Sequence, residues 1–136
     1  MSTISPILPS DHTKPIGKYS PAIAVPYNSH SNLVFISGQV ASDSSGHTIG
    51  LGDAGTQTAY VFDKIANILE NTGGDLSHLV SLTIYLTSMA DFSLVSNVRN
   101  NVLHDPAPSS TLVEVSRLAI QDHLVEISAV AVVPAK

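Results

Sequence analysis

The stretch Thr56–Leu86, TQTAYVFDKIANILENTGGDLSHLVSLTIYL, contains a helix pattern, a stop signal and a strand pattern in direct succession. Apolar residues recur every three or four positions across Thr56–Asn71, the spacing of one buried helix face; they are Val61, Phe62, Ile65, Ile68 and Leu69. Gly73-Gly74 predicts a glycine cap at the end of this helix. The next segment, Leu79–Leu86, alternates as a strand does, and the side expected to be buried carries Val80, Leu82, Ile84 and Leu86. A helix that returns directly into a strand indicates helices packed on a sheet.

The flanking segments extend this pattern in both directions. On the N-terminal side, Tyr19–Val25 and Asn32–Val40 are predicted strands. On the C-terminal side, Ser88-Met89-Ala90-Asp91 resembles a capping box and predicts a second helix. Two further strands are predicted over Ser110–Leu118 and Leu124–Val133. The order ββαβαββ predicts an α+β fold with a mixed sheet and both helices on one face.

The length and composition fit one domain over residues 1–136, and we expect the proline-containing segment 1–16 to be a loosely ordered N-terminal arm. The chain is 43% hydrophobic but only 12% charged, so it has few charges to cover its surface. No segment is left to cover the second face of the predicted sheet. Both observations predict a homo-oligomer, in which copies of the chain cover each other.

The charge pattern excludes several classes of partner. A net charge of -5 with only two arginines, Arg99 and Arg117, offers no clustered basic surface, so we expect no nucleic-acid partner. No apolar run has the length of a membrane span, and the N-terminal segment has neither the apolar core of a secretory signal nor the arginines of a transit peptide. We therefore expect a cytoplasmic protein with no membrane partner.

We expect neither a metal nor another cofactor. The chain has no cysteine, which excludes thiolate nucleophiles and cysteine metal sites. Its six histidines lie in predicted loops or at element ends, and none has the i, i+4 spacing of a helical metal pair. The glycine-rich segment 50–55 lacks the lysine of a phosphate-binding loop and is interpreted as a connection.

Several segments together resemble the Rid family, also called YjgF/YER057c/UK114: Gly17-Lys18-Tyr19-Ser20, Val34–Val40, Thr83–Phe92, and Val113–Leu118 with Val125-Glu126-Ile127. The resemblance extends from about Ile16 to Val133. It implies a chorismate-mutase-like (YjgF) fold and a homotrimer, in which the sheets form a central barrel and a small-molecule ligand binds in a cleft between subunits. It also implies cofactor-free hydrolysis of reactive imines and enamines to a carbonyl compound and ammonia.

The resemblance assigns roles to three residues. Tyr19 matches the tyrosine that lines the family's cleft, and Gly38 matches the glycine whose backbone amide faces the ligand. Glu126 matches the glutamate that holds a water near the substrate, with one extra residue in the preceding loop. A carboxyl group in a partly dry cleft acts as a general base, or as a proton donor if its pKa is raised. We therefore expect Glu126 and Tyr19 to be catalytic and Gly38 to bind the substrate.

Ser110 stands where deaminating relatives carry an arginine that grips the substrate carboxylate with two charge-assisted hydrogen bonds. A serine offers one neutral hydrogen bond, and the loss of such an ionic contact costs about 2–5 kcal/mol. Ala90 replaces the usual asparagine, and Leu112 replaces a small or thiol residue, so the site is also more apolar. These three residues predict a ligand without a free carboxylate: an imine, enamine or related carbonyl metabolite, in a hydrolase reaction that could serve specialised metabolism.

Several alternatives stay open at this point. Lys18 or Arg99 could supply the cation, or the loop before Ser110 could shift the match; the chain would then be a conventional 2-iminobutanoate/2-iminopropanoate deaminase. The chain could instead be a non-catalytic binding or chaperone-like member, with Glu126 paired across a subunit interface. Ribonuclease activity, attributed to some relatives, fits the acidic charge balance least well.

Overall fold

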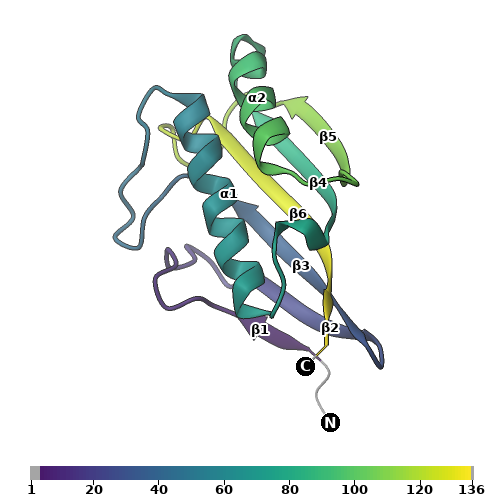
Figure 1. Cartoon of the computed structure of the whole chain (residues 1–136). Coiled ribbons are helices and arrows are strands. Elements are labelled where there is room, and N and C mark those ends of the chain that lie inside the picture. Colours follow the sequence, from purple (N-terminus) through teal and green to yellow (C-terminus); the bar gives the residue numbers. More distant parts are fainter. Residues whose placement is uncertain (1–3, 136) are drawn as a thin grey trace.

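Six strands form one mixed sheet in the computed structural model, which describes residues 4–135 (Figure 1). The strands are β1 (Ser5–Ile7), β2 (Ala22–Asn28), β3 (Ser31–Gln39), β4 (Leu79–Leu86), β5 (Ser109–Glu114) and β6 (Val125–Pro134). Their order across the sheet is β1-β2-β3-β6-β4-β5, and only β4 and β5 pair in parallel. The predicted α+β fold with a mixed sheet is confirmed.

Two α-helices, α1 (Ala54–Asn71) and α2 (Phe92–Val102), pack on one face of this sheet (Figure 1). Short 3-10 turns, η1 (Leu76–His78) and η2 (Met89–Asp91), precede β4 and α2. Helix α1 begins at Ala54 and is capped by Asp53, whose carboxylate accepts hydrogen bonds from Thr56 N (3.1 Å) and Thr56 Oγ1 (2.8 Å). These contacts fix the start of α1 two residues before the predicted position.

The C-terminus of α1 has the predicted glycine cap. Gly73 has a φ of +87°, a left-handed conformation that side chains disfavour. The N–H of Gly73 donates to Glu70 O (3.1 Å), and the N–H of Gly74 donates to Leu69 O (2.8 Å). This pair of bonds is a Schellman motif, which satisfies carbonyls that the helix leaves without partners.

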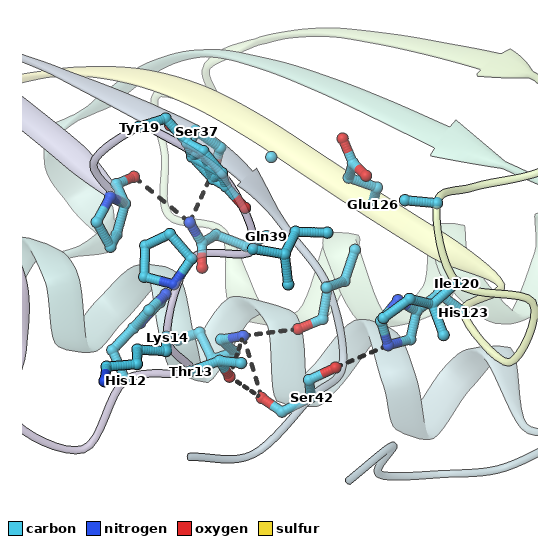
Figure 2. Close-up of a pocket in the computed structure, with 17 residues that line it drawn as sticks. His12, Thr13, Lys14, Tyr19, Ser37, Gln39, Ser42, Ile120, His123 and Glu126 are labelled. Atoms are coloured by element: carbon cyan, nitrogen blue, oxygen red, sulfur yellow. Dashed lines mark hydrogen bonds between the residues drawn. The ribbon is translucent and has the colours of Figure 1, made fainter. Parts of the chain in front are cut away.

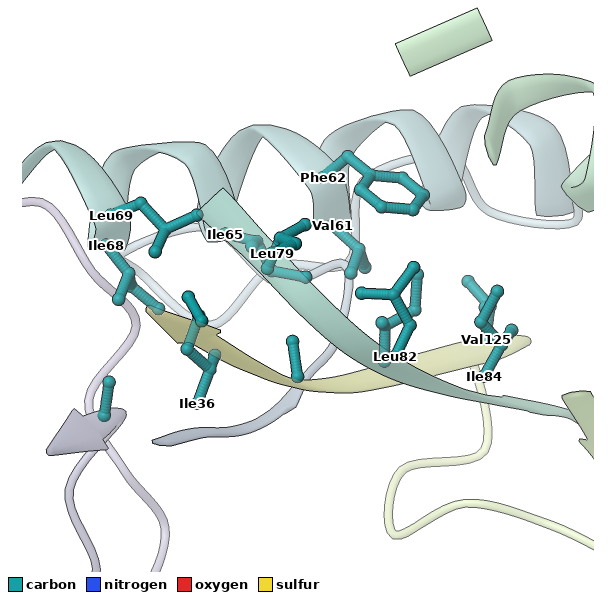
Figure 3. Close-up of a cluster of buried hydrophobic side chains, with 14 of the residues drawn as sticks. Ile36, Val61, Phe62, Ile65, Ile68, Leu69, Leu79, Leu82, Ile84 and Val125 are labelled. Carbon is teal, nitrogen blue, oxygen red and sulfur yellow. The ribbon is translucent and has the colours of Figure 1, made fainter. Parts of the chain in front are cut away.

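The hydrophobic core lies between α1 and the sheet (Figure 3). The apolar stripe predicted on α1 is fully buried against alternate residues of β3, β4 and β6, which include Val34, Ile36, Leu82, Ile84 and Ile127. The prediction that Val80 of β4 is buried is wrong, because Val80 is 45% exposed. The pairing of β4 with β6 shifts between Leu79 and Ser81, so Leu79 enters the core in place of Val80.

Two segments differ from the sequence-based expectation. The segment expected to be a loosely ordered arm contains β1, which pairs with β2 at the sheet edge; residues 1–3 lie outside the described residues. At the start of α2, the Ser88 hydroxyl accepts from Ala90 N (3.2 Å), but the carboxylate that accepts from Met89 N (2.8 Å) belongs to Glu114 of β5. The Asp91 side chain makes no capping hydrogen bond, so the predicted capping box is wrong, and a distant strand supplies a carboxylate to this turn instead.

The second face of the sheet is not covered by any element of residues 4–135 (Figure 1). Along β6, Val125, Ile127, Ala129, Ala131 and Val133 are buried, whereas the alternate residues point to the other face. Phe35 on β3 is 43% exposed and lines a shallow groove there with Ser128 and Val130. The homotrimer stays a prediction, and this open face is the surface it would use. No helix within residues 4–135 is long and apolar enough to cross a membrane.

Candidate functional site

One cavity brings together three of the predicted site residues, Tyr19, Gly38 and Glu126 (Figure 2). Its walls come from the segment 12–21, the end of β3, the loop 119–123, the start of β6 and one residue of α1. The cavity volume is about 110 Å³. A single water needs only about 10–15 Å³, so the space suits a small organic molecule.

Glu126 lies half-buried on the wall of this cavity. Burial raises the pKa of its carboxyl group above the ordinary value of 4.5, because the charged form loses hydration. Within residues 4–135, the Glu126 side chain has no hydrogen-bond or salt-bridge partner. The carboxyl group is therefore available to a water molecule or a ligand, and its raised pKa brings it closer to the range in which proton transfer is efficient.

Gly38 provides the space that the Glu126 carboxylate occupies. A Cβ atom at position 38 would overlap Glu126 Oε2 and lie 2.7 Å from Cδ. The backbone bulges here: Ile36 pairs with Ala129 and Gln39 with Ile127, so β3 carries one extra residue between them. The bulge and the missing side chain together set Gly38 against the carboxylate.

Tyr19 is half-exposed on the same cavity, in a segment attached to β3. The Ser37 N–H donates to Pro21 O (2.8 Å), and the Ser37 hydroxyl donates to Ser20 O (2.7 Å). The Gln39 side-chain amide also donates to Pro21 O (3.4 Å). These bonds hold the segment that carries Tyr19 next to Gly38.

Lys64 is a cavity residue that the sequence analysis missed. It belongs to α1 and is only 9% exposed. Its Nζ donates to Val40 O (2.8 Å), Ser42 O (3.1 Å) and Thr13 Oγ1 (3.2 Å), and burial lowers its pKa to about 8. The signal in the sequence was a lysine three residues after Val61 and four before Ile68, within the stripe predicted to be apolar.

Two histidines, His12 and His123, line the same cavity as Lys64. His123 is buried, and its Nε2 lies 2.8 Å from the Ser42 hydroxyl oxygen. Burial and, second, the charge of Lys64 lower the pKa of both His123 and His12. The lowered pKa values favour neutral imidazoles, so Lys64 is the cation of this buried cluster.

Ser110, Leu112 and Ala90 lie outside this cavity. The β4–β5 pairing sets Ser110 beside Leu82 and Leu112 beside Ile84, on the face covered by the helices. Glu126 pairs with Tyr85, whose side chain points to the open face. Ser110 and Leu112 therefore lie on the opposite face of the sheet from Glu126. Ala90 is exposed in η2.

Ser110 lines a separate cavity together with Arg99 of α2 and His104. The Arg99 guanidinium donates to Ser96 Oγ (3.0 Å) and Asn100 Oδ1 (3.2 Å), and it has no salt bridge to a carboxylate within residues 4–135. Arg99 is thus the cation next to Ser110. Lys18, the other substitute considered from the sequence, is exposed and lines neither cavity.

A family model described as Endoribonuclease L-PSP, the model of the YjgF/Rid family, matches residues 10–133. The chain belongs to this family. The resemblance found in the sequence is therefore confirmed over nearly the whole chain.

Individual members of the Rid family are similar over most of their length. A RutC family protein of Pyrococcus abyssi is 38% identical over 118 residues, which cover 87% of this chain and 88% of that protein. The 3-aminoacrylate deaminase RutC of Acinetobacter baylyi is 32% identical over 125 residues, which cover 92% of this chain and 94% of the deaminase. The crystal structure of RidA from an Antarctic Psychrobacter matches with a TM-score of 0.83 at 28% identity, over 93% of this chain and 98% of RidA. The fold is thus the YjgF fold.

Proposed function

We propose that this Rid-family chain hydrolyses a reactive imine, enamine or related carbonyl compound in the cavity of Glu126. The observation that carries the proposal is a half-buried carboxyl group with a raised pKa and no partner within residues 4–135, next to Gly38 and Tyr19. A relative that covers 92% of this chain is named a deaminase of 3-aminoacrylate, which is an enamine, and this supports the substrate class.

The proposed reaction uses Glu126 as both acid and base. Protonated Glu126 gives its proton to the enamine carbon, or to the imine nitrogen, and so makes the substrate carbon electrophilic. The ionised carboxylate then takes a proton from the water that attacks this carbon. Collapse of the resulting amino alcohol releases ammonia and leaves a carbonyl group. The Tyr19 hydroxyl and the Gly38 amide supply hydrogen bonds to the substrate, and no cofactor takes part.

The substrate we propose has no free carboxylate, because Ser110 supplies no charge. Ser110 and Glu126 lie on opposite faces of the sheet in one chain, so a cleft that contains both needs two copies. Strand β5 is at the edge of the sheet, where a second copy has access to it. We therefore propose a homotrimer with a cleft between each pair of neighbours.

One observation favours the alternative of a conventional deaminase. Arg99 lines the cavity of Ser110, and its guanidinium has N–H groups beyond the two that donate to Ser96 and Asn100. Such a group can bind a carboxylate with two hydrogen bonds. Turnover of 2-aminoacrylate and of its neutral methyl ester, each generated in situ, separates the two candidates. We expect the ester to be preferred, with Ser110→Arg shifting the preference toward the acid by about tenfold or more.

The proposed function is tested by replacing Glu126. Glu126→Gln keeps the shape but cannot exchange the proton, and the expected loss of turnover is about 10²–10⁴-fold. The control is Glu70→Gln, which changes an exposed glutamate on the outside of α1. Undiminished turnover in Glu126→Gln would overturn the proposal. Binding without any turnover by the unmodified protein would instead favour a non-catalytic member of the family.

A further inference from the structure

Lys64 carries a buried charge for which residues 4–135 provide no ionic partner. Its side chain is 9% exposed, and no carboxylate lies within salt-bridge distance. Burial of an unpaired ammonium is costly, and a protein that needs only packing at this position would place an apolar residue there. Lys64 also lines the cavity that contains Glu126. Figure 2 shows Ser42, whose carbonyl Lys64 contacts, on a different side of that cavity from Glu126.

The hydrogen bonds around Lys64 fit a neutral amine as well as an ammonium. A neutral amine has two N–H donors, and two carbonyls are present to accept them, those of Val40 and Ser42. The third partner is the Thr13 hydroxyl oxygen, which accepts from Nζ at 3.2 Å while its own hydrogen is directed at the Ser42 and Asp43 carbonyls (2.7 and 2.8 Å), so only this longest contact is lost in the neutral amine. Loss of a proton from Nζ therefore leaves neither carbonyl without a donor, and it frees a lone pair.

The other titratable groups around Lys64 give its ammonium form little electrostatic stabilisation. Asp11, Tyr60 and Asp63 line a second cavity with Lys64, but within residues 4–135 neither carboxylate lies at salt-bridge distance from Nζ. His12 and His123 line the cavity with lowered pKa values, which favour their neutral forms. Asp43 raises the pKa of Lys64, but less than burial lowers it, and the result is a pKa of about 8. Glu126 belongs to the same cavity and is itself shifted toward its neutral form. A desolvated lysine with little electrostatic support is the kind that acts as a nucleophile.

We propose that Lys64 is a nucleophile that forms an imine with carbonyl compounds and imines that enter this cavity. With an aldehyde, the Nζ–C bond forms, and the carbonyl oxygen leaves as water with the two hydrogens of Nζ. With an imine substrate, Nζ adds to the carbon, the original C–N bond breaks, and ammonia leaves with those two hydrogens. Water then hydrolyses the lysine imine to the carbonyl product and the free amine. This second route rests on the proposed function, with Glu126 as the group that exchanges protons.

The first test needs no variant. The full chain is incubated with propanal and sodium cyanoborohydride, which reduces an imine to a stable secondary amine, and the alkylated lysines are mapped by peptide mass spectrometry. We expect Lys64 to react with a half-maximal rate near pH 8, well before the exposed Lys18 in the same digest. Alkylation of Lys64 no faster than that of Lys18 would overturn the proposal.

The second test separates a nucleophile from a structural lysine. Lys64→Arg keeps the charge and the donors to Val40 and Ser42, but the guanidinium is not nucleophilic at these pH values. We expect it to abolish trapping and to lower imine turnover about 100-fold, while Glu126→Gln still traps propanal at Lys64. Full turnover in Lys64→Arg, with turnover lost in Glu126→Gln, would refute the covalent route and leave the proposed function standing. Trapping of propanal at Lys64, together with full turnover in Glu126→Gln, would instead refute the proposed role of Glu126 and leave Lys64 as a nucleophile.

Discussion

The carboxylate of Glu126 occupies the space that a side chain at position 38 would need. We predict that Gly38→Ala displaces this carboxylate and lowers turnover about 100-fold, because a misplacement of about 1 Å is enough to do so. Stability should change by less than about 1 kcal/mol, since the displaced group is the flexible end of a side chain. Gly17→Ala is the matched control, as a Cβ there meets nothing within 4 Å. Enzyme assays and thermal melts check both variants; equal turnover in the two would contradict the prediction.

The same carboxyl group should make the protein less stable as the pH rises. Above the ordinary pKa of 4.5 the unfolded chain loses this proton, whereas the folded chain retains it up to the raised pKa. The folded state then binds more protons, so the free energy of unfolding decreases with pH across that window. We predict that Glu126→Gln is more stable than the unmodified protein above the window, and that the difference vanishes at low pH. Melting curves over a pH series measure this, with Glu70→Gln as the control that should show no such trend.

At the residue scale, the sequence predicted Tyr19, Gly38 and Glu126, which the structure brings together in one cavity. Their roles stay predictions. Lys64 could not be predicted as a cavity residue, because a lysine in a helix normally points to solvent and the apolar members alone define the stripe. The separation of Ser110 from Glu126 could not be predicted either, because the side of the sheet that each residue faces depends on strand pairing.

At the element scale, the two glycines near the ends of α1 should respond to alanine in opposite ways. Gly73 has a φ of +87°, so Gly73→Ala should destabilise the protein by about 1–2 kcal/mol. Gly55 lies in the first turn of α1, and a Cβ there would meet atoms only at 3.5 and 3.8 Å. Gly55→Ala should therefore stabilise by about 0.5 kcal/mol. Chemical denaturation measures both changes in the free energy of unfolding. A similar loss of stability in the two variants would contradict the prediction that the left-handed conformation of Gly73 sets the difference.

Elements with long, regular patterns were predicted well, and those set by tertiary contacts were not. The stripe of α1 and the alternation of β6 each extend over several turns or pairs, so both elements appear in the structure with ends that differ from the prediction by at most two residues. Strand β1 has only three residues, too few to show an alternation, and forms because β2 presents an edge. Val80 was assigned to the wrong side because a bulge is a property of the pairing with β6.

At the scale of the whole molecule, the open sheet face and the divided site have the same explanation. The groove beside Phe35 exposes apolar side chains on a sheet that no described element covers. Glu126 and Ser110, which the family pattern places in one cleft, lie on opposite faces of that sheet. A second copy against the open face would cover the apolar surface and could complete the cleft at once. Oligomerisation and activity should therefore be lost together.

This coupling predicts that two inactive variants restore each other. Glu126→Gln removes the proton carrier from one half of the cleft, and Ser110→Trp fills the other half at an exposed position. Each variant alone should be inactive. In trimers formed by co-expressing equal amounts of the two, a cleft works only if it takes Glu126 from one variant and Ser110 from the other, so about a quarter of the clefts should recover. Turnover of the purified mixed trimers, with sedimentation to establish the oligomeric state, checks this. Recovery of no activity from a mixed trimer would contradict a cleft shared between neighbouring copies, and full activity of Ser110→Trp alone would show that Ser110 has no part in the site.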